Sequence, residues 1–413
     1  MVVTFINAGN NDMNGTMKKS GRAYLFLSKL LFTILIISVY CIGRSIPLYG
    51  IDTSVYDNAL DAGMLLEQSV GGDLYKCSIM ALGISPYMIS SILVQLIVAC
   101  KPKEVKARTS AKKMNRLTVI FMLMLSITQS ILRLDELVFV TDKYPFMKLV
   151  AFLEMITGAC IIMWLCGRNK KYGIGGQTVL IFVNIVDGIM VNLRSVNRSE
   201  AMIPVLVSVI AALLMIFMEN SEKRIPVQRI SIHNIYADKN YQAIKFNPVG
   251  VMPVMFTSAA YMIPGLLARM LLRNMPDNAR VIWINDNLDL NKPLGIAVYI
   301  GILFILNITL SYLIINPSDM MEQFLKSGDS LAGIHPGKDT KRYLKKHILQ
   351  ISFVSSMVLG GCVFASLYLQ MKGALVGTLA MLPTSAMILM GLWSNLYKEA
   401  EAIIHTDSYK TFI

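Results

Sequence analysis

Ten segments of this chain are long and apolar enough to cross a lipid bilayer. A helix of about 20 apolar residues spans the ~30 Å hydrocarbon core. Because lipid offers no partners to backbone N–H and C=O groups, such segments must be helical. We expect membrane helices at residues 24–43, 78–99, 117–137, 149–166, 177–193, 202–218, 249–272, 294–315, 349–370 and 374–394. The sequence therefore predicts an all-α polytopic membrane protein with ten transmembrane helices.

Composition and charge agree with this class and indicate an orientation. Hydrophobic residues make up 54% and charged residues 16% of the chain, whereas roughly 25% of residues are charged in an average soluble protein. Of the 39 lysines and arginines, 26 fall in the two terminal segments and in the connections after even-numbered spans, and nine fall in the opposite loops. The positive-inside rule places both termini of this multi-pass plasma-membrane protein in the cytoplasm. The net charge of +13 is thus mainly an orientation signal, and we expect no nucleic-acid partner.

A nine-residue pattern occurs at the starts of both the second and the seventh span. Residues 83–91 read GISPYMISS and residues 250–258 read GVMPVMFTS, so Gly, Pro, Met and the final Ser coincide. The two spans are five apart and cross the membrane in opposite senses. Such a Gly/Pro-interrupted pair is typical of an inverted repeat around a central path, although biased composition also produces matches by chance.

Two cytoplasmic connections, at residues 219–248 and 316–348, are longer than a link between helices requires. Both are polar and basic. Two interpretations remain open from composition alone: a solvated segment that only sets topology, or a docking surface for a cytosolic partner.

Residues that could support catalysis or metal binding are sparse. The six cysteines show no CxxC spacing and the four histidines lie outside the apolar segments, so we expect no metal, no cofactor and no enzymatic activity. Ionisable side chains within a membrane are functional candidates by default, and Asp187 is the one carboxylate in the middle of a span. It could serve a proton-coupled small-solute carrier, which is the alternative function. Arg133 is expected to extend to the membrane interface, and residues 173–176 are expected to form a turn.

Five sequence blocks in a fixed order resemble the SecY family of protein-conducting channels of the bacterial plasma membrane. Residues 81–92, ALGISPYMISSI, are similar to the second-helix motif of that family. The other blocks follow in family order at residues 43–52, 173–175, 224–228 and 326–337. Each block is weak alone, but the ordered set extends over essentially the whole chain.

The resemblance implies a clamshell of two inverted five-helix halves around an hourglass pore that conducts unfolded polypeptide. The halves would comprise residues 24–198 and 199–394, flanked by cytoplasmic segments at 1–23 and 395–413. Apolar segments of the substrate would leave sideways through a lateral gate between helices two/three and seven/eight, with gate positions at Pro86, Gln95 and Pro253. A short plug is implied near residues 61–74, at Gly71 and Gly72.

The resemblance also implies an apolar ring at the constriction of the pore, formed by Ile84, Met88, Ile181, Met255 and Leu382. A second position in span five falls on Gln177 or Thr178. A constriction that water wets poorly can pass a chain without leaking ions, and Ile84 and Met88, four residues apart, share one helix face. Ordinary bundle packing is the competing interpretation of the same residues.

The resemblance further implies a SecA-type motor ATPase, a small SecE-type membrane subunit and an unfolded preprotein as partners, in membrane lipid. Candidate ATPase contacts in the two long connections are Lys223, Arg224, Arg229, His335, Lys338, Lys341, Arg342, Lys345 and Lys346. His335 stands where the family has an arginine that works with SecA. This departure and the trimmed outer loops are similar to the accessory Sec paralogue of Gram-positive cocci, which exports serine-rich glycosylated adhesins with its own SecA paralogue and accessory secretion proteins.

Overall fold

The computed structural model describes most of the chain and places a helix in every predicted span. The described residues are 26–51, 77–99, 110–134, 137, 139, 145–194, 198–229, 241–275, 278–288, 290, 292–331, 333–372, 379 and 382–405. The ten helices are Phe26–Arg44, α3 (Ser85–Ala99), α5 (Ala111–Leu134), α6 (Pro145–Tyr172), α7 (Gln177–Arg194), α8 (Arg198–Asn220), α9 (Met252–Asn274), α11 (Pro293–Ile315), α13 (Lys338–Met371) and α14 (Leu382–His405). The prediction of a helical, polytopic membrane protein is confirmed.

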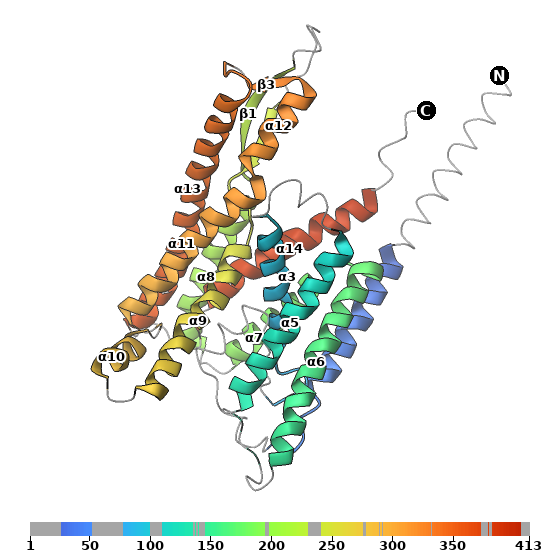
Figure 1. Cartoon of the computed structure of the whole chain (residues 1–413), viewed down its shortest axis with the longest axis vertical. Helices are drawn as coiled ribbons and strands as arrows, with labels where there is room; N and C mark the ends of the chain where they lie inside the picture. Colours follow the sequence, from blue (N-terminus) through green and yellow to red (C-terminus); the bar gives the residue numbers. More distant parts are fainter. Residues whose placement is uncertain are drawn as a thin grey trace, which may run out of the picture.

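In chain order the membrane helices can be described as an N-terminal and a C-terminal group, and Figure 1 shows how they lie in space. In the N-terminal group, which begins with helix Phe26–Arg44, α3 packs against α5, α5 against α6 and α6 against α7. In the C-terminal group, α11 packs between α9 and α13, and α14 lies along α8. α14 also contacts α7 and thereby joins the groups, whereas α3 meets α11 over a small contact. One large buried apolar cluster includes residues of both groups.

The two copies of the nine-residue pattern adopt the same local geometry. Gly83 and Gly250 have φ angles of 59° and 70°, in the region that glycine occupies without strain. In each copy the helix that follows carries its proline in the first turn, where a missing N–H costs no intrahelical bond. Ser90 and Thr257 donate hydrogen bonds to the carbonyl oxygens of those prolines, at 2.6 and 2.7 Å. The repeat in the sequence is therefore also a repeat in structure.

The described parts of the two long connections, at residues 219–248 and 316–348, fold together into one unit, here called the platform (Figure 1). The platform consists of β1 (Glu222–Arg229), β2 (Tyr241–Lys245), α12 (Pro317–Ser327), β3 (Asp329–Leu331) and the first three turns of α13. Its antiparallel sheet has the order β2-β1-β3, with Lys223 opposite Ile244 and Val227 opposite Leu331. The expectation of an all-helical chain did not include this sheet.

The platform has a hydrophobic core of its own. Its buried members are Ile225, Ile244, Phe324, Leu331, Leu344, Ile348 and Ile351. These residues come from both connections, so burial of apolar surface holds the two connections together. The described part of the connections is thus a packed unit and not a solvated segment, while its roles in setting topology and in docking a partner stay predictions.

Several helix boundaries differ from the sequence-based expectation, most clearly those of α3, α13 and α14. α3 begins at Ser85, not at residue 78, because the turns at residues 77–84 contain the positive-φ Gly83. α13 begins at Lys338, before the predicted residue 349, because Leu344 and Ile348 bury one face of its polar first turns against the platform core. α14 begins at Leu382 and continues to His405, beyond the predicted end of the span.

The expected turn at residues 173–176 is confirmed, and it is tied to the first helix. The side-chain amide of Asn169 donates hydrogen bonds to the carbonyl oxygens of Ile174 and Gly176, both at 2.9 Å. The backbone N–H of Ile174 donates to the hydroxyl oxygen of Thr33 at 2.9 Å. This turn therefore fixes the start of α7 relative to helix Phe26–Arg44.

Candidate functional site

The five ring positions are all buried at the centre of the helix bundle. Their exposed fractions lie between 0% and 4%. Ile84, Met88, Ile181 and Met255 belong to the same buried cluster, which joins the two helix groups. Leu382, the first residue of α14, is buried outside that cluster. The four apolar side chains of the cluster are therefore buried together.

The start of α9 contributes one more residue, which the sequence reasoning missed. Val251 occupies the position of Ile84 in the second copy of the repeat, is 2% exposed and lies in the same cluster. Both residues directly follow the positive-φ glycine of their copy. The repeat pairs Ile84 with Val251 just as it pairs Met88 with Met255, so this signal was present in the sequence.

The positions predicted for the lateral gate divide into two kinds. Pro86 and Pro253 are buried in the first turns of α3 and α9. Gln95 is exposed, and its side-chain amide donates to the hydroxyl of Ser91 in the same helix at 3.3 Å. The structure thus does not bring the three residues together. The predicted plug, with Gly71 and Gly72, lies outside the described residues.

Asp187 is engaged in an ion pair within the N-terminal group. A guanidinium nitrogen of Arg44 donates to a carboxylate oxygen of Asp187 at 2.9 Å, and the two side chains are 6% and 35% exposed. One turn away, the hydroxyl of Tyr40 donates to the amide oxygen of Asn184 at 2.8 Å. Both bonds join helix Phe26–Arg44 to α7. Asp187 therefore balances the charge of a buried arginine, and this arrangement does not support the carrier hypothesis.

Replacing Asp187 with Asn is expected to destabilise the protein while export continues at permissive temperature. The variant removes the carboxylate that pairs with the buried Arg44, and because Asp187 is partly exposed we expect a loss of about 1–3 kcal/mol in the free energy of unfolding. Thermal unfolding in detergent measures the loss, and Asp286→Asn, at an exposed position of α10 (Ala279–Asn287), is the control. Loss of a proton-coupled solute flux with unchanged stability would instead restore the carrier hypothesis.

The expectation that Arg133 extends outward to the membrane interface is wrong. Its side chain is 6% exposed and donates a hydrogen bond to the carbonyl oxygen of Ala81, in the turn before α3. A buried carbonyl group without a helical partner needs a donor, and the guanidinium supplies it. Arg133 therefore fixes the turn that precedes α3, the helix that carries Met88.

The cationic residues predicted to dock an ATPase are gathered on the platform. Those of the second connection lie on one face of the first turns of α13, with intervals of three and four residues. Lys338, Arg342, Lys345 and Lys346 are exposed there, and Lys341 is half-buried. His335, in the turn before α13, is exposed and its carbonyl oxygen accepts from Thr340 at 2.9 Å. These residues are thus available at the surface, and their role in docking an ATPase stays a prediction.

The cations of β1 point in different directions. Arg224 is exposed, lies 4.6 Å from the ring centroid of Tyr241 and donates to Glu222 at 2.8 Å. This bond to Glu222 raises the pKa of the Arg224 guanidinium, so it keeps its charge. Lys223 points to α13, where its ammonium group donates to Nδ1 of His347 at 3.0 Å. Arg229 is the last residue of β1, opposite Asp329 of β3.

A group of charged side chains lies where β2 of the platform meets α8 and α14. Glu219, at the end of α8, is 7% exposed and accepts from the ammonium group of Lys398 on α14 at 3.2 Å. Partial burial, and then the neighbouring Lys398, lower the pKa of Lys245 on β2. Two lysines therefore surround one buried carboxylate where β2, α8 and α14 meet.

The fold, with its buried apolar cluster between the membrane helices, is that of a polytopic membrane channel. Solved structures share this fold: the chain described as "The structure of a protein conducting channel" matches with a TM-score of 0.66 at 17% identity, over 93% of this chain and 95% of that one. Sec61 in the canine ribosome-channel complex from the endoplasmic reticulum matches with a TM-score of 0.60 at 16% identity, over 93% and 95%.

Sequence comparisons specify the family. The SecY family model matches residues 78–397. The accessory Sec system protein translocase subunit SecY2 of Leuconostoc gelidum is 27% identical over 94% of this chain and 96% of its own. The SecY2 subunit of Streptococcus agalactiae is 30% identical over 78% and 80%, and the protein translocase subunit SecY of Streptococcus gordonii 28% over 94% and 95%. The chain belongs to the SecY family.

Proposed function

We propose that this chain is the central channel subunit of a Sec-type preprotein translocase and conducts unfolded polypeptide across the plasma membrane. The observation that carries the proposal is the buried apolar ring between two helix groups, built from a structurally repeated Gly-Pro segment in α3 and α9. An apolar constriction between two halves can part around a chain and close against ions. The channel itself performs no covalent step, so the energy comes from a partner.

We further propose that it serves an accessory Sec system. The SecY2 relatives that match over nearly the whole chain support this assignment, and His335 in place of the family's arginine agrees with it. The substrates would then be serine-rich glycosylated adhesins, and the partners a dedicated SecA-type ATPase, a SecE-type membrane subunit and accessory secretion proteins. With both termini in the cytoplasm, as the charge asymmetry predicts, the platform lies on the side from which the ATPase acts.

The docking site for this ATPase is the cationic face of the platform. The exposed lysines and arginines of α13 stand on a rigid support, because Leu344 and Ile348 of the same turns are buried in the platform core. Charges held on a packed helix keep their spacing, so they can complement an acidic surface and speed its association. Glu219 and Lys398 connect this unit to α14, whose first residue is Leu382 of the ring.

Capture of a stalled substrate tests the channel function. A photo-crosslinking residue at Met88 is expected to form an adduct with a secreted polypeptide whose C-terminal domain is too tightly folded to be exported. Met88 lies in the ring, so only a chain inside the channel reaches it. The same residue at Met124, which is 61% exposed on α5, is the control and should form no adduct. Equal labelling at both positions, or none at Met88 with the substrate stalled, would contradict the proposal.

A further inference from the structure

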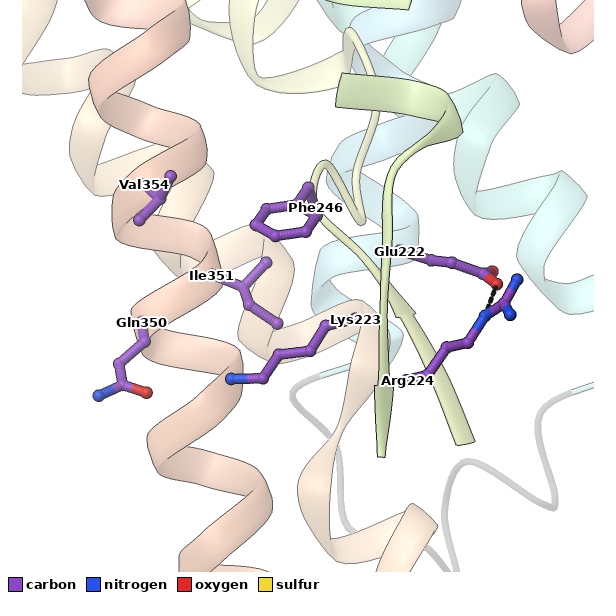
Figure 2. Close-up of a pocket in the computed structure, with 7 residues that line it drawn as sticks. All are labelled: Glu222, Lys223, Arg224, Phe246, Gln350, Ile351 and Val354. Carbon is purple, nitrogen blue, oxygen red and sulfur yellow. Dashed lines mark hydrogen bonds and ion pairs between the residues drawn. The ribbon is translucent and has the colours of Figure 1, made fainter. Parts of the chain in front are cut away.

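An open pocket of about 480 Å³ lies between the platform and α13 (Figure 2). Its residues are Glu222, Lys223, Arg224, Phe246, Gln350, Ile351 and Val354. Phe246, Ile351 and Val354 form an apolar side, and Lys223 extends across the pocket to α13. Lys223 and Arg224 were predicted as ATPase contacts, but the apolar side formed by Phe246, Ile351 and Val354 has no role in the proposed function.

The pocket lies where α13 enters the membrane. Lys345 and Lys346 are exposed on the turn before it, whereas Phe353, Val354 and Met357, about one turn beyond its polar end, are 49%, 46% and 55% exposed. Exposed apolar side chains on a membrane helix face lipid. The polar end of the pocket therefore lies at the depth of lipid headgroups, and its apolar end at the depth of the first acyl carbons.

The charges at the polar end favour an anion. The ammonium group of Lys223 donates a hydrogen bond to Nδ1 of His347 at 3.0 Å. The acceptor in this contact is an imidazole nitrogen and not a carboxylate, so the contact does not neutralise the positive charge of Lys223. The carboxylate of Glu222 is held by Arg224, at 2.8 Å and on the side away from α13. Lys345 and Lys346 add positive charge on the adjacent turn of α13. Basic pockets between membrane helices on the cytoplasmic side suit anionic headgroups.

We propose that this pocket binds an anionic phospholipid, with its phosphate against Lys223 and the first part of an acyl chain against Phe246, Ile351 and Val354. A cation at headgroup depth followed by apolar surface at acyl depth matches the order of groups in a phospholipid. A bound lipid would contact β1 of the platform and α13 at once. The lipid would hold the platform against the membrane through the side of β1 that carries Lys223. Arg224 extends from the opposite side of β1.

Native mass spectrometry of the full-length protein tests the proposal. Phosphatidylglycerol is added to delipidated protein and the bound molecules are counted for the wild type, for Lys223→Gln and for the control Lys170→Gln, an exposed lysine at the cytoplasmic end of α6. Removing one lysine from a headgroup contact is worth about five-fold in affinity. We therefore expect one lipid to bind about five-fold more weakly to Lys223→Gln, and no change in the control.

Competing ligands and a second variant identify what the pocket binds. Phosphatidylcholine should not replace phosphatidylglycerol, and inorganic phosphate should not compete with it, because the apolar end of the pocket contributes to binding. Val354→Trp, which fills that end without touching Lys223, should lower retention as well. Equal retention by the wild type and Lys223→Gln, or equal binding of both lipids, would overturn the proposal. So would displacement of all lipid from the pocket by a membrane helix of a partner subunit.

Discussion

Replacing Met88 and Met255 together with glycine is expected to make the membrane leak ions. Both side chains are buried, in equivalent positions of the two repeats, and lie in the apolar cluster between the helix groups. Removing them opens a space beside Ile84 and Ile181 that water can enter, and an apolar gate fails once it is wetted. Planar-bilayer conductance of the reconstituted variant should rise several-fold above wild type, and more than for either single variant.

The matched control uses two methionines that face lipid. Met124→Gly with Met357→Gly changes residues that are 61% and 55% exposed on α5 and α13. Each glycine costs a helix about 1 kcal/mol in either pair, so loosened helices would make both double variants leak alike. A tight membrane with Met88→Gly/Met255→Gly would show that these residues are ordinary bundle packing and that the ring is assigned wrongly.

Reversing the charges of Lys341 and Arg342 to glutamate is expected to impair export without changing membrane insertion. Arg342 is exposed and Lys341 half-buried on α13, and neither belongs to the platform core that contains Leu344 and Ile348. The platform therefore stays folded, while like charges now meet an acidic partner surface. We expect the ATPase to bind about 10–100-fold more weakly, which corresponds to about 1.4–2.8 kcal/mol. Export in membrane vesicles and ATPase binding at low and moderate salt measure the effect.

Lys170→Glu with Lys171→Glu is the control for this prediction. These lysines are exposed at the cytoplasmic end of α6, so the variant changes the net cytoplasmic charge by the same amount on another surface. It should bind the ATPase as the wild type does. If both double variants lose export equally, the effect is one of total charge, and the platform is not the docking site. Unaffected export by Lys341→Glu/Arg342→Glu would count against the site as well.

The membrane helices could be predicted because hydropathy is a local property. A run of about 20 apolar residues specifies a spanning helix whatever surrounds it, so each predicted span coincides with a helix. The repeat could also be recognised from local sequence. The backbone at both places needs a glycine with positive φ, Gly83 or Gly250, followed by a proline in the first helical turn, and both requirements appear as residue types in the sequence. Boundaries were predicted less well where packing extends a helix. α13 begins as early as Lys338 because Leu344, in its polar first turns, is buried in the platform core.

The cytoplasmic connections show what local patterns miss. The strands of the platform are short and polar, and β1 contains Pro226, so nothing in their composition predicts a sheet. They form one because β1 pairs with both β2 and β3, which lie in different connections. The same pairing orients the cations that composition could only count. It leaves Arg224 in solvent and directs Lys223 to α13.

The sequence by itself determined the helical segments of the membrane region, the two-fold repeat and the apolar character of the residues predicted for the ring. These are properties of consecutive residues and of their hydropathy. Only the tertiary structure decided the roles of single charges: Asp187 balances Arg44 across 143 positions, and Lys223 meets His347 across 124. Charges interact through space and not along the chain, so their partners emerge only when the fold brings distant residues together.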